Sequence, residues 1–132
     1  TETALMFDMP KAIETLGHLR EMGIAIAVDD FGTGYSSLAR LRSLPIDQIK
    51  IDRSFVMNSD HDEKDAQVVR MVIGLAQTLG LDIVAEGVES EQQAELLRIS
   101  GCTVSQGHYY AHAQSAEHIG SMLRDTWRVT SD

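Results

Sequence analysis

The chain has 132 residues, enough for one domain with a hydrophobic core, and 43% of them are apolar. Its formal net charge of −9 argues against a partner that is a nucleic-acid polymer, because such a binder needs a basic stripe. No apolar run approaches the roughly 20 residues of a membrane span, so we expect no membrane contact in this segment. Cys102 is the single cysteine, which excludes an intrachain disulfide and favours a reducing, cytoplasmic compartment.

The predicted elements alternate between helix and strand from the start of the chain. No signal peptide opens the sequence. Because the first residue is Thr1 and not Met, we expect a piece of a longer polypeptide. Asp8 and a proline two residues later indicate the start of a helix that ends at Gly23. The β-branched and alanine-rich run at 24–28 predicts a strand buried on both faces. Pro45 ends a second helix after a glycine-rich turn.

The same order repeats through the rest of the chain. Further strands are expected at 48–51, 83–85 and 104–106. An acidic loop at 60–65 precedes a long helix that ends at a glycine, and later helices are expected at 91–100 and after Ser115. Helices between strands imply parallel pairing with right-handed crossovers.

Two architectures share this order: an open doubly wound sheet and a (β/α)8 TIM-like barrel. Polar residues follow every predicted strand, and only a barrel brings all strand ends to one mouth. A whole barrel needs about 250 residues. We therefore expect residues 1–132 to be a single unit with four parallel β/α units, about half of a barrel. The open edges of such a half predict self-association.

Adjacent carboxylates directly after the first strand are the first candidate site. Asp29 and Asp30 repel one another unless cations neutralise them. Oxygen ligands suit Mg²⁺ or Mn²⁺, and two such ions about 4 Å apart can hold a phosphodiester for in-line attack. A helix N-cap or a structural pair on a loop remains the alternative.

The later strand ends carry further polar residues. Lys50 and Asp52 are two apart and are expected to point to the same side of the second strand. They could meet a metal-bound water or a phosphate, or form only a surface salt bridge. Glu86 ends the third strand, and Gln106 ends the fourth.

Three other motifs are weighed and set aside. Asp30-Phe31-Gly32 matches a kinase tripeptide, but no His-Arg-Asp loop precedes it. The glycines that follow lack the Gly-Lys-Ser/Thr of a Walker loop. Two hypotheses remain for them: a tight turn, or a mobile loop over a ligand. His108 and His112 have a zinc-binding spacing only on a helix, and this stretch is predicted to be strand and loop.

Together these residues resemble the EAL family of bacterial cyclic di-GMP phosphodiesterases. The similarity includes Asp29-Asp30-Phe31-Gly32-Thr33-Gly34 and continues through the following loop. It also includes Lys50-Ile51-Asp52-Arg53-Ser54-Phe55 and Val84-Ala85-Glu86-Gly87-Val88-Glu89. Gly101-Cys102 leading to Gln106-Gly107 and the opening Thr1–Met6 are similar too. Order and spacing agree over essentially all 132 residues.

The resemblance implies hydrolysis of one phosphodiester of cyclic di-GMP to linear pGpG with Mg²⁺ or Mn²⁺. Asp29, Asp30 and Glu86 would belong to a two-metal site. Lys50 would orient or activate the attacking water, and Asp52 would support the same cluster.

The remaining implied roles concern substrate and a regulatory loop. Gln106 would hold water or substrate, and Glu89 would steady a loop that contains Gly32, Thr33 and Gly34. The family is cytoplasmic in its catalytic part, is often a homodimer, and often shares a chain with sensory or diguanylate cyclase domains.

Two departures from the family pattern matter. The Glu-Ala-Leu motif, its downstream asparagine and the first glutamate of Glu-x-Thr-Glu would lie before Thr1, so the chain alone is expected to lack a complete metal site and to be inactive. His108 replaces a usual aromatic residue, and His112-Ala113 replaces a basic residue and proline. A non-catalytic cyclic di-GMP receptor is therefore the second hypothesis, and a dimerisation or regulatory fragment without a ligand is the third.

Overall fold

The computed structural model describes residues 8–32 and 38–129, and its centre is a four-stranded parallel sheet. The strands pair in consecutive order, β1-β2-β3-β4. They are β1 (Ala27–Phe31), β2 (Gln48–Ile51), β3 (Asp82–Ala85) and β4 (Val104–Ser105). A doubly wound sheet reverses its strand order at a switch point, whereas a barrel adds each strand beside the last. The observed order confirms the prediction of a partial α/β barrel.

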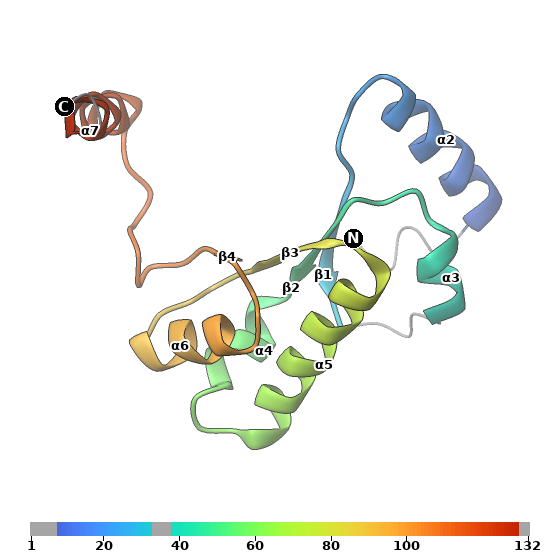
Figure 1. Ribbon diagram of the computed structural model, residues 1–132, viewed down its shortest axis with the longest axis horizontal. Helices are drawn as coiled ribbons and strands as arrows, with labels where there is room; N and C mark the ends of the chain where they lie inside the picture. Colours follow the sequence, from blue (N-terminus) through green and yellow to red (C-terminus); the bar gives the residue numbers. More distant parts are fainter. Residues whose placement is uncertain (1–7, 33–37, 130–132) are drawn as a thin grey trace.

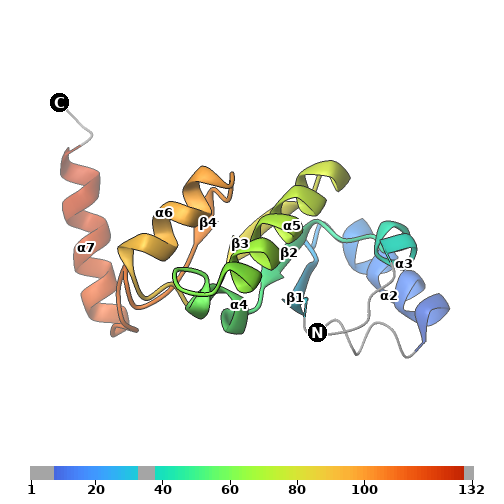
Figure 2. The same ribbon diagram turned by 90° about the horizontal axis from the view of Figure 1, so that it is seen from below.

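Six helices accompany the sheet within the described residues. They are α2 (Met9–Glu21), α3 (Leu38–Ser43), α4 (Arg53–Asn58), α5 (Glu63–Leu79), α6 (Glu91–Ile99) and α7 (Ala116–Val129). Helices α2 and α3 lie towards the β1 end of the sheet, and α7 stands apart from the body beyond β4 (Figures 1 and 2). None of the described helices is both long enough and apolar enough to cross a membrane.

Local sequence signals account for the helix ends. The Asp62 side chain accepts a hydrogen bond from the Lys64 amide and caps α5. Gly80, with φ of 68°, ends that helix in the left-handed conformation that glycine adopts without strain. Ser90 and Gln93 form a complete capping box at the start of α6.

Several predicted boundaries were wrong. The acidic loop predicted at 60–65 is shorter, because Glu63 already begins α5 and its acidic first turn suits the positive end of the helix dipole. The first strand runs over 27–31 rather than 24–28, so the aspartates expected after the strand lie within it. Helix α4 was not predicted, since six residues are too few to show an apolar period.

The core lies between the sheet and the helices that follow each strand. Ile49 and Ile51 of β2 have no exposed surface. The buried face of α5 covers them with Val69, Val72, Ile73 and Ala76. This packing fixes the strands in register and holds their carboxyl ends along one edge.

Candidate active site at the strand ends

Each strand contributes one polar side chain, from within the strand or directly after it, to a continuous chain of contacts. The Lys50 Nζ donates to Asp29 Oδ1 at 3.0 Å and also to Glu86 Oε1. The Gln106 Nε2 donates to the same Glu86 oxygen at 2.9 Å. Asp29, Lys50, Glu86 and Gln106 were each proposed from the sequence, and the fold brings them together although up to 77 positions separate them in the printed sequence.

A β-bulge places both aspartates opposite Lys50. Val28 pairs with Ile49 and Phe31 pairs with Ile51, so two residues of β1 stand opposite one residue of β2. Asp30 has φ of 57°, in the left-handed region that aspartate tolerates better than most residues. Bulges of this kind redirect a side chain, and here the bulge leaves Asp29 aimed at the Lys50 ammonium.

The charge state of Lys50 follows from its neighbours. The hydrogen bonds that Lys50 donates to Glu86 and Asp29 raise the pKa of its ammonium above the usual value, against a smaller opposing effect of burial. Because the amine stays protonated at neutral pH, it can donate to a water or a phosphate oxygen but cannot accept a proton. The Asp29 side chain is 45% exposed, so a ligand can reach this cluster from solvent.

The ends of β3 and β4 are joined beyond the regular strands. The Val88 amide donates to the Gln106 carbonyl at 3.1 Å, and the Tyr109 amide donates to the Val88 carbonyl at 3.0 Å. A Cβ at Gly107 would overlap the backbone of Val88. This close approach fixes Gln106 relative to Glu86.

The carboxylates of this cluster have the chemistry of a divalent-metal site. Asp29, Asp30 and Glu86 offer the hard oxygen atoms that Mg²⁺ and Mn²⁺ prefer. Within residues 8–32 and 38–129, no group of three His, Cys, Asp or Glu side chains is arranged to hold a metal ion. Asp29 and Glu86 instead flank the ammonium of Lys50, which balances their charge. The donor type fits, and the described residues supply only part of a ligand set.

Other predicted site residues have local partners. The Asp52 side chain caps α4 and accepts from the Ser54 amide at 2.9 Å. Glu89 forms an ion pair with Arg53 at 2.6 Å. Gly32 lies against the ring of Phe55. Thr33 and Gly34 lie outside the described residues, as do the opening residues 1–7, so the expected loop over the site is not described.

The two histidines of the last loop are not on a helix: His108 lies in a turn and His112 in the irregular chain that follows it. The ring centroids of His108 and His112 are 4.2 Å apart with the planes tilted by 35°. Both side chains are exposed, and no third metal-ligating residue joins them among the described residues.

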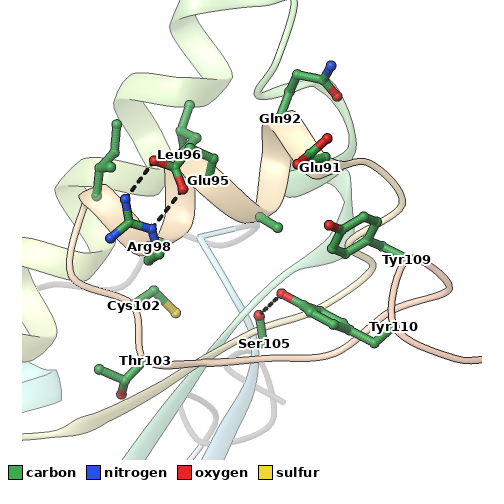
Figure 3. Close-up of a pocket in the computed structure, with 12 residues that line it drawn as sticks. Glu91, Gln92, Glu95, Leu96, Arg98, Cys102, Thr103, Ser105, Tyr109 and Tyr110 are labelled. Atoms are coloured by element: carbon green, nitrogen blue, oxygen red, sulfur yellow. Dashed lines mark hydrogen bonds and ion pairs between the residues drawn. The ribbon is translucent and has the colours of Figure 1, made fainter.

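A separate groove of about 740 Å³ runs between α6 and the chain that includes β4 (Figure 3). The sticks in Figure 3 come from α6 on one side and from residues 102–110 on the other. The Tyr110 hydroxyl lies 2.5 Å from Ser105 Oγ within it. None of the four side chains of the strand-end cluster lines this groove, so it is distinct from the candidate active site.

The sequence interpretation did not assign roles to two residues near the cluster. Gln93 is 4% exposed and contacts both α4 and the loop after β3. Its position three residues after Ser90 is a capping-box signal that could have identified it. Arg53 reaches the same loop through Glu89, and no sequence pattern predicts that pairing.

Fold and site together define a parallel α/β half-barrel with an acidic, lysine-centred cluster at its strand ends. The EAL domain family model matches residues 1–113. The chain therefore belongs to the EAL domain family.

Similar proteins agree with this assignment. The cyclic di-GMP phosphodiesterase NbdA of Pseudomonas aeruginosa is 44% identical over 94% of this chain and 16% of NbdA. The cyclic di-GMP phosphodiesterase RocR of the same organism is 43% identical over 90% of this chain and 30% of RocR.

Solved structures show the same fold. The PaMucR phosphodiesterase in complex with c-di-GMP superposes with a TM-score of 0.83 at 44% identity, over 87% of this chain and 47% of that one. The EAL domain of Mycobacterium smegmatis DcpA gives a TM-score of 0.82 at 42% identity, over 89% of this chain and 53% of that one. The chain thus spans about half of these solved chains and less than a third of the curated relatives named above.

Proposed function

We propose that this chain is the C-terminal half of an EAL domain that hydrolyses one phosphodiester of cyclic di-GMP to linear pGpG. The observation that carries the proposal is the contact chain from Asp29 through Lys50 and Glu86 to Gln106. The relatives named as cyclic di-GMP phosphodiesterases, and the c-di-GMP complex of PaMucR, support this choice of substrate.

The cationic and neutral side chains of the cluster would have different roles in catalysis. Lys50 donates hydrogen bonds and so would orient or activate the attacking water, or bind a phosphate oxygen. Gln106 keeps one Glu86 oxygen in place and has its own amide oxygen for water or substrate. Asp52 supports the cluster through the capped start of α4.

Asp29, Asp30 and Glu86 would hold Mg²⁺ or Mn²⁺ together with residues from the N-terminal half of the domain. The bound cations would supply charge neutralisation at the phosphate and a water of lowered pKa. On this proposal residues 1–132 alone bind metal weakly and have no turnover, because the described residues supply only part of the ligand set.

The wider setting is also proposed rather than derived from contacts. We place the domain in the cytoplasm, as a homodimer, in a polypeptide that carries sensory or diguanylate cyclase modules. The name of MucR, a bifunctional diguanylate cyclase/cyclic di-GMP phosphodiesterase that is 44% identical over 90% of this chain, supports such a fusion.

The test is turnover of cyclic di-GMP by the full-length polypeptide with Mg²⁺ present. We expect pGpG as the product, and Asp29→Asn or Lys50→Met should lower kcat at least about 100-fold. Arg70→Gln is the matched control, because Arg70 also forms an ion pair, with Glu63 at 2.9 Å, but lies on α5 away from the cluster.

Other outcomes would contradict parts of the proposal. Tight binding of cyclic di-GMP by calorimetry without turnover would assign the protein to the receptor class and direct attention to His108, His112 and Ala113. Neither binding nor turnover would leave a regulatory or dimerisation module. Turnover by the isolated 132-residue chain would contradict the proposal that it holds only part of the metal site.

A further inference from the structure

Helix α4 contacts two glycines that closely follow candidate metal ligands in the sequence, Gly32 after β1 and Gly87 after β3. On one side, the Phe55 ring lies against Gly32, where an added Cβ would be 2.9 Å from Phe55 Cε2. On the other side, the aliphatic stem of Arg53 lies over Gly87, where an added Cβ would overlap Arg53 Cγ. Gly87 directly follows Glu86 and has φ of 73°, a conformation that favours glycine.

The Arg53 side chain is held at two points as it crosses this loop. Its Nη2 donates to Glu89 Oε1 at 2.6 Å, and its Nε donates to Met57 Sδ at 2.9 Å. The Arg53 side chain therefore crosses the loop between Glu86 and Glu89. It is bonded to Glu89 at the end of that loop and to Met57 of α4.

Gln93 holds the same loop from the buried side. Its Oε1 accepts from the Glu89 amide at 2.7 Å and from the Ser90 amide at 3.1 Å. Its Nε2 donates to the Met57 carbonyl at 2.9 Å. Gln93 itself is 4% exposed, and its part-buried hydrogen bonds hold the end of the loop on α4.

We propose that Arg53 is a positioning residue for Glu86, and that it acts by holding residues 87–89 against α4. The carboxylate of Glu86 can meet both Lys50 and Gln106 only while the loop behind it keeps this path. The proposal rests on the proposed phosphodiesterase function. The Arg53 and Glu89 side chains are 55% and 39% exposed, and such pairs contribute little to stability, so the loss of Arg53 should alter the site more than the fold.

The experiment compares Arg53→Gln with wild type in the full-length protein. We expect kcat to fall about tenfold and the Mg²⁺ concentration for half-maximal rate to rise about tenfold, with KM for cyclic di-GMP and Tm unchanged. Calorimetric titration with Mn²⁺ in the absence of substrate should show the same weakening of metal binding. Arg53→Lys should restore part of the loss, because the charge and the aliphatic stem remain.

Controls separate positioning from a general structural effect. Arg70→Gln removes an exposed ion pair of similar length elsewhere and should change neither kcat nor metal binding. The double variant Arg53→Gln/Glu89→Gln should lose little more kcat and metal affinity than either single variant, because both changes remove the same contact.

Two results would overturn the inference. Wild-type kcat and Mn²⁺ affinity in Arg53→Gln would show that the loop keeps its path without the arginine. A fall in Tm with parallel loss of substrate binding would show a structural role alone. If wild type itself fails to hydrolyse cyclic di-GMP, the proposed function fails, and the Mn²⁺ titration still tests Arg53 by itself.

Discussion

The middle of the sheet and its β4 end differ in how their apolar side chains are covered. In β2, Ile49 and Ile51 have no exposed surface, since strands lie on both sides and α5 packs across them. At the other end, Val104 of β4 is 52% exposed. Leu123 of α7 is 66% exposed, and that helix stands away from the body (Figure 2).

The difference shows which parts of the fold this chain can complete alone. A central strand receives both neighbours and its covering helix from the β/α units beside it. Within the described residues the last strand pairs with β3 only, and Ile119, Met122 and Leu123 of α7 are exposed. The chain therefore contains a complete core, which positions the site. At its β4 end it exposes apolar surface, as expected if the proposed other half of the barrel covers that end.

The largest expected contrast is in stability between the two regions. Ile73→Ala should lower the free energy of unfolding by about 2–5 kcal/mol, because it leaves a cavity beneath α5. Leu123→Ala should change it by less than about 0.5 kcal/mol, because that side chain is exposed. Urea unfolding of the 132-residue chain measures both. An equal cost at both positions would mean that α7 is covered in solution.

A glycine pair tests how tightly the end of β4 is held. Gly107→Ala should destabilise the fold by about 1–3 kcal/mol, because its Cβ would overlap the Val88 backbone. Gly74→Ala is the control: it lies inside α5 with no atom within 4 Å of an added Cβ, and should stabilise by about 0.5–1 kcal/mol. Thermal unfolding compares the two, and a harmless Gly107→Ala would contradict the close approach.

A pair of glutamine variants tests the hydrogen bonds by which Gln93 holds the loop after β3. Gln93→Leu should lower the free energy of unfolding by about 1–3 kcal/mol, because it leaves the part-buried amides of Glu89 and Ser90 and the carbonyl of Met57 without this partner. Its neighbour Gln92 is exposed, and Gln92→Leu should shift stability by less than about 0.5 kcal/mol. Equal changes in the free energy of unfolding for Gln93→Leu and Gln92→Leu, measured with urea, would contradict this role of Gln93.

The smallest expected effect concerns the thiol near the groove. Burial raises the pKa of Cys102, which is 6% exposed and lies 3.1 Å from the Val104 carbonyl oxygen. Labelling by a disulfide reagent at about pH 8 should be at least about tenfold slower in the folded chain than in the unfolded chain. At higher pH the unfolded chain ionises first, so this thiol makes the folded state less stable as the pH rises. Equal labelling rates would indicate that the groove opens freely.

Much of the architecture could be predicted from the sequence because its signals are local. Glycine at position 80, the Ser90 cap and the alternation of apolar runs each act within a few residues. The strand-end positions of Lys50, Glu86 and Gln106 follow from that alternation. Since parallel strands end at one edge, the sequence also implied that these side chains would meet.

Other features depend on contacts between distant residues and left no local pattern. The bulge at Asp29 and Asp30 appears only in the register of β1 against β2. Helix α4 has six residues, and its pairing of Arg53 with Glu89 joins positions 36 residues apart.

The sequence by itself determined the order of the β/α units, the polar residues at the strand ends and, through motif resemblance, the family. Tertiary structure decided that Lys50 bridges Asp29 and Glu86, and that α4 with Gln93 holds the loop behind Glu86. The reason is physical: periodicity and capping are properties of neighbouring residues, whereas a bridging ammonium and a buried amide depend on how separate strands and helices pack.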